Sequence, residues 1–268
     1  MSAKPTMGQR LRMVFSSSYM FYLYAPILIL PLFSFNDSYY ISFPFKAFTT
    51  RWYSELAADP SIISALLVSV QIGLITAALS TALGVLTARA LTRQRLRGYR
   101  SIVGLIMLPM VIPELIMAVS LLVVLNKASL GLGKWAVVLG HMLVCYPFAV
   151  AILMSRFEGF SVLLEEASLD LGATPWQTFW RVVFPLTLPG VVASFLLTFT
   201  ISFDEFLIAY FLSSSEPTLP VYLWGQLRFP KKLPSALALG TLIIACSFVI
   251  VALAEWLRRR HANSDLTS

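Results

Sequence analysis

The sequence predicts an all-α polytopic membrane protein with six transmembrane helices in a single domain that covers residues 1–268. Composition, the length of the apolar runs and the distribution of positive charge support this prediction. Of the 268 residues, 58% are hydrophobic and only 12% are charged, which is too apolar for a soluble domain of this length. A transmembrane helix needs about 20 apolar residues, and the chain offers six such runs: 14–35, 62–90, 101–126, 134–155, 187–212 and 235–257.

The 20 Lys and Arg residues are divided unevenly between the two sides of the membrane if all six runs span it. Thirteen lie on the side of the N-terminus and seven on the other side. Because cytoplasmic loops retain positive charge, both termini and the segment 156–186 are expected in the cytoplasm. The net charge of +7 then reflects topology in the lipid bilayer, and no nucleic-acid partner is expected.

The first run, 14–35, follows Lys4, Arg10 and Arg12 and therefore has the outline of a signal peptide. It is longer than a usual signal core, and no small-x-small cleavage site follows it. We expect it to remain as the first span. Cys145 and Cys246 fall inside predicted spans, where a thiol is a small packing group, so neither a disulfide framework nor a metal site is expected.

The first outer loop, residues 36–61, is rich in aromatic side chains. One interpretation, which we favour, is a belt of amphipathic rings at the level of the lipid headgroups. The other is that some rings, Trp52 among them, line the outer mouth of a pathway and attract a cationic solute through their faces. The sequence does not separate these interpretations.

The second run carries small and hydroxyl residues that let helices approach closely, among them Ser69, Gly73, Thr76, Ser80 and Gly84. Five arginines follow it in residues 89–100. We expect this basic loop to lie near anionic lipid headgroups on the cytoplasmic side.

The third run contains two prolines, Pro109 and Pro113, that are expected to break the helix. Glu114 follows directly, about 20 Å from the cytoplasmic end at 1.5 Å per residue. Interrupted helices at such depth are tolerated where they line a cavity, so Glu114 is a candidate pathway residue. The alternative is that Glu114 pairs with a residue of the same chain.

Between the fourth and fifth runs, residues 156–186 interrupt the apolar pattern with polar and turn-forming residues. Ser161 is expected to cap a short helix through its hydroxyl, and Gly172 to end it in the left-handed conformation. Thr174 and Pro175 then predict a second helix start, with Gln177 completing a capping box. Proline residues at 185 and 189 are expected to end that helix.

On the first of these short helices, residues three and four apart are neighbours. Leu164, Ala167 and Leu171 are therefore predicted to share one face, and Glu166 and Asp170 another. Two rigidly capped helices between membrane spans indicate an element that a partner protein contacts.

The fifth run holds two adjacent acids, Asp204 and Glu205, toward its outer end. Neighbouring helical residues point about 100° apart, so only one of them can face a central pathway squarely. No Lys or Arg lies in any predicted span near them, so we expect their partners in another subunit, in water or in a cationic substrate. The alternative is a structural or gate-closing hydrogen-bond cluster. His141 in the fourth run is interpreted as a hydrogen-bond partner between helices.

The segment 156–186 resembles the cytoplasmic loop of the permease subunits of ATP-binding-cassette importers. That loop carries Glu-Ala-Ala, three residues, Gly, nine residues, Ile, one residue and Leu-Pro. The present chain has Glu166-Ala167-Ser168, Gly172, Val182 and Phe184-Pro185 at the same spacing. Ser168 replaces the second Ala, and Val182 and Phe184 are apolar replacements.

The resemblance implies a type I importer permease fold in which this loop docks on a separate ATPase and passes its motion to the membrane helices. By this resemblance the docking residues are Glu166, Ala167, Asp170, Gly172, Ala173 and Pro185. It also implies a dimer of ATP-binding subunits, a second permease subunit that is a different chain, and an external solute-binding protein. No P-loop pattern is present in the chain, so ATP and Mg²⁺ are expected on the ATPase partner, with no cofactor and no catalytic residue on this chain.

Four further segments resemble the permeases of spermidine and putrescine importers: Phe35 to Ser38, Thr50 to Tyr53, Phe199 to Glu205, and Leu219-Pro220. The resemblance implies alternating access for a polyamine at the bacterial inner membrane, with Asp204, Glu205 and Glu114 as counter-charges. Permeases for opines, thiamine and phosphonates look alike and remain the alternative. An ion-coupled secondary transporter and an intramembrane enzyme are the rivals from other classes.

Overall fold

The computed structural model describes residues 7–93, 97–159, 161–245 and 248–249. Every regular element in these ranges is helical, apart from one isolated bridge between Asn36 and Phe48. Four helices there are long and apolar enough to cross a membrane, and a bent pair of helices would make a fifth. The predicted all-α membrane class is confirmed at this level. The sixth predicted run, 235–257, lies partly outside the described residues, and its described part belongs to a helical stretch over 233–245.

The chain forms two compact units, the first from Met1–Pro60 with Leu223–Ser268 and the second from Ser61–Tyr222. The first unit contains α1 (Met7–Ser34), α2 (Arg51–Ala58) and η3 (Pro230–Lys232), followed by the helical residues 233–245. This last stretch packs closely on α1, because a Cβ atom on Gly240 would lie 2.9 Å from the Leu30 side chain. α11 (Leu219–Gln226) crosses the boundary between the units.

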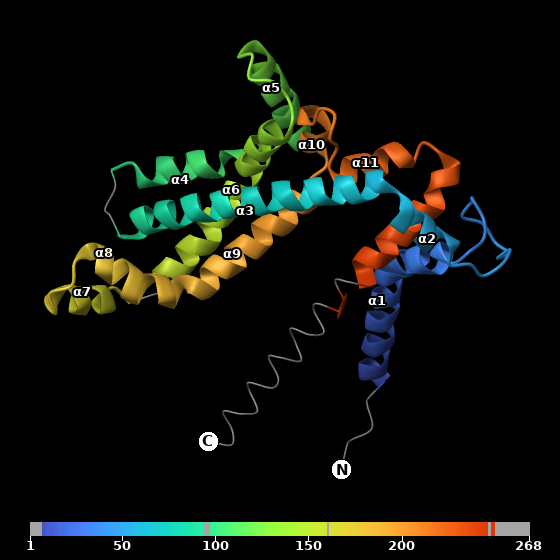
Figure 1. Cartoon of the computed structure of the whole chain (residues 1–268). Helices are drawn as coiled ribbons and strands as arrows, with labels where there is room; N and C mark the ends of the chain where they lie inside the picture. The colour runs from blue at the N-terminus through green and yellow to red at the C-terminus, as the bar shows by residue number, and fades with distance from the viewer. Residues whose placement is uncertain (1–6, 94–96, 160, 246–247, 250–268) are drawn as a thin grey trace. The chain divides into compact units, whose positions relative to one another are not determined.

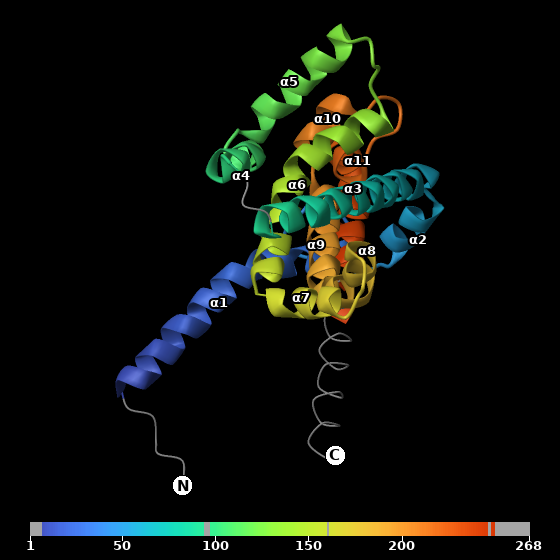
Figure 2. The ribbon, with the colours of Figure 1, turned by 90° about the vertical axis from the view of Figure 1, so that its left-hand side faces the viewer.

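Three long helices dominate the second unit: α3 (Pro60–Arg93), α6 (Lys134–Glu158) and α9 (Phe184–Asp204), as Figures 1 and 2 show. The predicted small residues of α3 lie at its contacts with the other two. A Cβ atom on Gly84 would lie 3.1 Å from Ala149 of α6, and one on Gly73 would lie 3.0 Å from the Phe199 ring of α9. The expectation of close helix packing along α3 is therefore confirmed.

The third predicted span, 101–126, is not one straight helix. α4 (Tyr99–Met107) and η1 (Leu108–Met110) are followed by α5 (Glu114–Lys127), and the chain bends by 95° at the break. Pro113 precedes α5 and has no N–H to continue the helix, so the predicted break is confirmed. The fifth predicted span, 187–212, is broken as well, since α9 ends at Asp204 and α10 (Leu207–Leu212) starts anew.

The expectation that prolines end the helix after residue 175 is wrong. α8 (Pro175–Thr178) runs through a wider π turn, η2 (Phe179–Val183), directly into α9, which contains Pro189. The Phe184 N–H bonds to the Phe179 carbonyl five residues back. This wider turn relieves the clash that Pro185 would otherwise make with the preceding turn.

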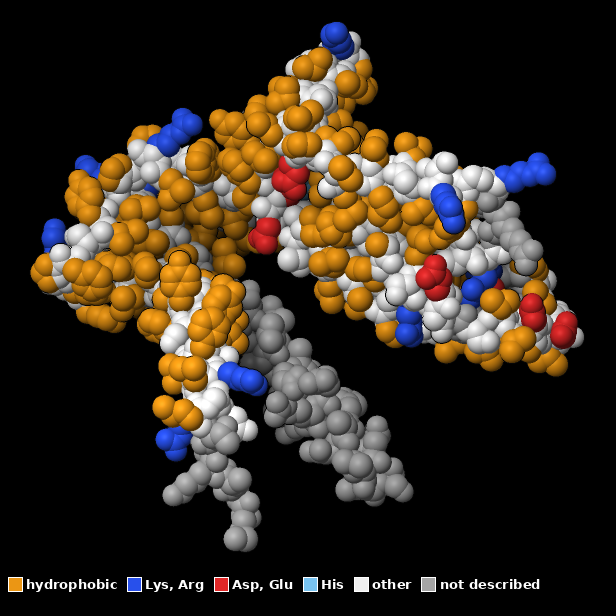
Figure 3. Space-filling view, turned by 180° about the vertical axis from the view of Figure 1, so that it is seen from behind, with side chains coloured by type: hydrophobic (Ala, Val, Ile, Leu, Met, Phe, Trp, Pro, Cys, Tyr) orange, Lys and Arg blue, Asp and Glu red, His pale blue; other side chains and the backbone are white. Residues whose placement is uncertain are grey.

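A hydrophobic core joins α3, α5, α6 and α10, with Ile72, Met117, Val137 and Ile208 among its buried members. α10 packs against both α5 and α6. Outside this core many large apolar side chains are exposed, and hydrophobic side chains cover much of the surface in Figure 3. Such a surface suits helices that contact lipid or other membrane subunits.

Candidate functional site

The loop between α6 and α9 is built as the sequence predicts at its central turn. α7 (Val162–Asp170) is followed by Gly172, whose φ of +89° is left-handed. The Gly172 N–H bonds to the Leu169 carbonyl at 2.9 Å, and the Ala173 N–H bonds to the Ser168 carbonyl at 3.2 Å. These two bonds make a complete Schellman motif, so the predicted role of Gly172 is confirmed.

The start of α8 is also as predicted. The Gln177 N–H donates to the Thr174 hydroxyl at 3.3 Å, and the Thr174 N–H donates to the Gln177 side chain at 3.0 Å. With Pro175 as the first helical residue, this is the expected capping box. Together with the Schellman motif it fixes the angle between α7 and α8 without any partner.

The predicted hydroxyl cap at Ser161 does not form. Ser161 occupies the N-cap position of α7, but its side chain makes no capping hydrogen bond. In a hydroxyl cap the Leu164 N–H would donate to the Ser161 hydroxyl, but here it donates to the Ser161 backbone carbonyl at 3.3 Å. The first turn is thus closed by the backbone.

The candidate docking residues lie at the surface of the loop. Glu166, Ala167, Asp170, Gly172 and Pro185 are exposed and Ala173 is half-buried. The expected apolar face of α7 is present but uncovered, since Leu164 is exposed and Leu171 has 89% of its surface accessible. Two further exposed apolar residues, Leu163 and Trp176, were not predicted. Exposed apolar groups rimmed by polar residues are typical of a surface that a partner covers.

Glu165, which the sequence did not single out, is the buried residue of α7. Its Oε1 lies 2.7 Å from Nε of Arg93, and its Oε2 lies 3.7 Å from Nη2 of Arg89. Arg89 and Arg93 at the end of α3 therefore face a carboxylate of the same chain and not the lipid headgroups expected for them. Arg95 lies outside the described residues, and for Arg97 and Arg100 the expectation stays a prediction. The opposite charges of Arg89, Arg93 and Glu165 are the sequence features that could have indicated this contact, but only the folded chain brings them together.

Glu205 lies at the break between α9 and α10 and is buried. Its carboxylate accepts hydrogen bonds from the N–H groups of Ile208 at 2.9 Å and Ala209 at 3.1 Å. His141 Nε2 lies 3.1 Å from Oε2, although not in hydrogen-bond alignment, and His141 Nδ1 lies 2.7 Å from the Ser202 hydroxyl. The expectation that Glu205 must find its partner outside the chain is wrong, because α10 and His141 supply one.

Asp204 and Glu114 are placed differently from Glu205. Asp204 is the last residue of α9 and Glu114 the first of α5, and both are exposed. No ion pair to either is seen among the described residues. Each sits at a helix break, and α5 and α10, which follow these breaks, share one core.

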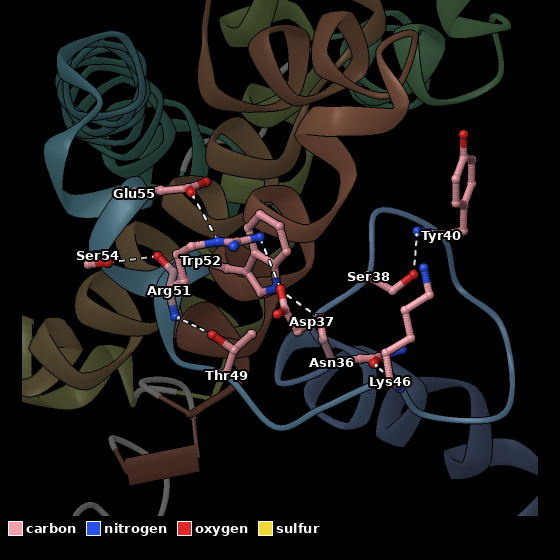
Figure 4. Close-up of polar contacts among 10 residues, drawn as sticks. All are labelled: Asn36, Asp37, Ser38, Tyr40, Lys46, Thr49, Arg51, Trp52, Ser54 and Glu55. Carbon is pink, nitrogen blue, oxygen red and sulfur yellow. Dashed lines mark hydrogen bonds and ion pairs between the residues drawn. The ribbon is translucent and has the colours of Figure 1, made fainter.

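Trp52 lies in the first unit with no part of its side chain exposed. Its indole N–H donates to the Asn36 carbonyl at 2.9 Å, and the Arg51 guanidinium stands 4.3 Å from its ring centroid. Figure 4 shows Arg51 also reaching Asp37 at 3.0 Å and Glu55 at 3.3 Å. Trp52 therefore anchors the segment that begins at Asn36 on α2 and does not present its ring at a surface.

Among the described residues, no group of three or more His, Cys, Asp or Glu side chains could hold a metal ion. The candidate residues lie on capped helices, at helix breaks and on an exposed loop. Such parts suit a protein that moves and contacts partners.

Comparison with known proteins agrees with this arrangement. Residues 80–263 match the family described as "Binding-protein-dependent transport system inner membrane component". The spermidine/putrescine transport system permease protein PotC of Escherichia coli K12 is 34% identical over 259 residues, which cover 96% of this chain and 97% of PotC. PotC of Haemophilus influenzae is 37% identical over 242 residues, covering 90% and 93% of the two chains. The putrescine permease protein PotI of Escherichia coli K12 is 32% identical over 247 residues, covering 89% and 87%.

A solved structure, the crystal structure of a bacterial ABC transporter involved in the import of the acidic polysaccharide alginate, superposes with a TM-score of 0.76. The match covers 95% of this chain and 99% of that one at 17% identity, and so bears on the fold alone. The fold is that of an ABC importer permease. The chain therefore belongs to the family of inner membrane components of binding-protein-dependent transport systems, as a transport subunit and not an enzyme.

Proposed function

We propose that this chain is one of two permease subunits of an ATP-driven importer whose solutes are polyamines. The proposal places the whole chain in one six-span domain with both termini and the segment 156–186 in the cytoplasm. Its partners are a dimer of ATP-binding subunits, a second and different permease chain, and an external solute-binding protein. ATP and Mg²⁺ bind the ATPase in this proposal, and no cofactor binds this chain.

The observation that carries the transport role is the loop of α7 and α8. Its shape is fixed by internal caps, while its outer surface combines the exposed carboxylates Glu166 and Asp170 with the exposed apolar side chains Leu163, Leu171 and Trp176. A segment that is ordered by itself and apolar on its outside supports docking on another protein. Because α8 continues into α9, movement of the docked loop would reach the membrane directly.

The polyamine assignment rests on the names of the relatives and on the exposed acids at the helix breaks. Asp204 ends α9, where the helix dipole is negative, so its carboxylate and the dipole both favour a cation. Glu114 begins α5, the helix that follows the break at Pro113. Discontinuous helices of this kind form ion and substrate sites in transporters, and we propose Asp204 and Glu114 as transient counter-charges for a passing polyamine.

Glu205 and Trp52 have other parts in this proposal. Glu205 is turned toward His141 and the start of α10, so it holds the break at which Asp204 stands. Trp52 is enclosed in the outer loop, so it shapes that loop without contacting solute. A pathway must release its solute, so no tight permanent site is expected.

Uptake by the whole complex in proteoliposomes tests the proposal. Radiolabelled putrescine, spermidine and an anionic control would be compared for the unchanged chain, for Asp204→Asn and for Glu158→Gln, which alters an exposed carboxylate at the cytoplasmic end of α6. We expect ATP-dependent uptake of the two amines, lowered by Asp204→Asn and unchanged by Glu158→Gln. Uptake of the anion in preference to the amines would refute the polyamine assignment and leave the transport role standing.

A further inference from the structure

The loop of α7 and α8, which we call the docking loop, is joined by the chain to α6 and α9. Among the described residues its shortest side-chain hydrogen bond is with a third helix. Arg93 is the last residue of α3, and its Nε lies 2.7 Å from Oε1 of Glu165 on α7. The Arg93 and Glu165 side chains are only 15% and 12% exposed. A charge-assisted hydrogen bond shielded from water in this way is stronger and more directional than a surface ion pair.

A second arginine of α3 extends this contact to the π turn. Arg89 lies one helical turn before Arg93, with Nη2 3.7 Å from Glu165 and Cζ 4.6 Å from the Phe179 ring centroid. Within the loop, the Ser168 and Thr178 hydroxyls lie 3.0 Å apart and join α7 to the end of α8. The end of α3 is therefore held both by α7 and by the π turn that leads into α9.

Apolar packing lies beneath these polar contacts. Val85 and Ala88 of α3, Leu153 and Phe157 of α6, and Val183 of the π turn form one buried cluster. Apolar contacts resist separation but are non-directional, so they set the orientation of α3 against the loop less specifically than a charge-assisted hydrogen bond does. The Glu165 carboxylate between two guanidinium groups restrains that orientation.

We propose that Glu165, with Arg93 and Arg89, is a mechanical link that makes α3 follow the docking loop during the transport cycle. Glu165 is a positioning residue here, since it touches neither the solute nor ATP. The inference rests on the proposed function, because it assumes that an ATPase moves the loop. It adds α3 to the helices that the ATPase drives.

The two adjacent glutamates of α7, Glu165 and Glu166, have different roles in this proposal. Glu166 is exposed and available to the ATPase, whereas Glu165 is turned inward to α3. Neighbouring helical residues point about 100° apart, so one helix can hold a partner with one carboxylate and a membrane helix with the next. Substitutions at these two positions are consequently expected to fail in different ways.

The test uses the complete complex with four forms of this chain: Glu165→Gln, Glu165→Arg, Glu165→Arg with Arg93→Glu, and Glu166→Gln. For each, co-purification of the ATPase and solute uptake per ATP hydrolysed would be measured. Glu165→Gln should keep the ATPase bound and lower uptake per ATP by about fivefold or more, the lower end of allosteric coupling. Glu165→Arg should lower it further, and the reversed pair should recover only part of that loss, because Arg89 still stands beside position 165.

A second readout follows α3 itself. Spin labels at the exposed positions Leu86 of α3 and Leu139 of α6 would report the distance change that ATP causes, with Cys145 and Cys246 replaced by Ser. Glu165→Gln should reduce that change, while Glu166→Gln should weaken ATPase binding.

Unchanged uptake per ATP and an unchanged distance signal in Glu165→Gln would overturn the link. So would a loss of ATPase binding in Glu165→Gln as large as that in Glu166→Gln, since Glu165 would then be a docking residue. If the unchanged chain associates with no ATPase at all, the proposed function itself fails and the link fails with it.

Discussion

Gly172 gives the sharpest prediction about the docking loop. Its φ of +89° is left-handed, and a Cβ atom added there would meet nothing within 4 Å. Substitution therefore creates no clash with a neighbour, and its whole cost is backbone strain. For a residue with a Cβ the left-handed conformation costs about 1–2 kcal/mol, and a β-branched residue is strained further.

That strain acts on the angle between α7 and α8, because the Schellman bonds of Gly172 and Ala173 require the left-handed turn. A cost of about 1–2 kcal/mol changes a conformational ratio by roughly 5- to 30-fold. If binding to the ATPase needs the capped form, the apparent affinity falls by up to that factor. Asparagine tolerates the left-handed region better than other residues with a Cβ, so Gly172→Asn is the matched control.

The assay is titration of the co-encoded ATPase onto the detergent-purified subunit, with its thermal unfolding followed in parallel. We expect the affinity for the ATPase to fall least in Gly172→Asn, more in Gly172→Ala and most in Gly172→Val. The membrane helices should unfold at nearly the same temperature in all three, since Gly172 is exposed on the loop. Equal affinity of Gly172→Val and the unchanged chain would show that ATPase binding does not depend on the left-handed turn at Gly172.

Two more substitutions test buried residues. Glu205→Gln keeps the side-chain shape but removes the negative charge that faces Ile208, Ala209 and His141, so we expect the free energy of unfolding to fall by about 1–3 kcal/mol. The control Glu216→Gln, at an exposed ion pair with Lys134, should cost at most about 1 kcal/mol. Equal melting temperatures of the two variants would contradict a stabilising role of the Glu205 charge. Trp52→Ala should lower the free energy of unfolding by about 3–5 kcal/mol because the ring is fully buried. The control Trp135→Ala, at an exposed ring, should change it by no more than about 0.5 kcal/mol. A loss for Trp52→Ala as small as that of the control would mean that the segment from Asn36 does not depend on this anchor.

The local features of the docking loop could be predicted because they depend on a few neighbouring residues. The left-handed turn at Gly172 and the capping box of Thr174 and Gln177 follow from conformational preference and hydrogen-bond reach. The break at Pro113 follows from a missing N–H for the same reason. The size of its bend, 95°, depends on how α5 packs on α10 and is not written in the local sequence.

The features that the sequence did not reveal depend on residues far apart in the chain. Glu165 meets Arg93 across 72 positions, and Glu205 meets His141 of another helix. A continuous span over 187–212 would keep Glu205 in the helix of Asp204, whereas its ψ of 123° is extended and its side chain accepts hydrogen bonds from the start of α10. Proline is a clear signal for the end of a helix, whereas a π turn has no comparable sequence signal. The sequence therefore predicts a helix end at Pro185, although the π turn before it lets the helix continue.

In the proposed function, an ATPase drives this transport subunit through the α7–α8 loop. The most direct test of this role is site-specific cross-linking from Ala167→Cys, exposed on α7, with Leu130→Cys, exposed after α5, as the matched control. We expect a cross-link from position 167 to the ATPase partner that changes with ATP, and none from position 130. A cross-link from position 130 alone, or ATP-driven uptake with no cross-link from position 167, would contradict this role of the loop.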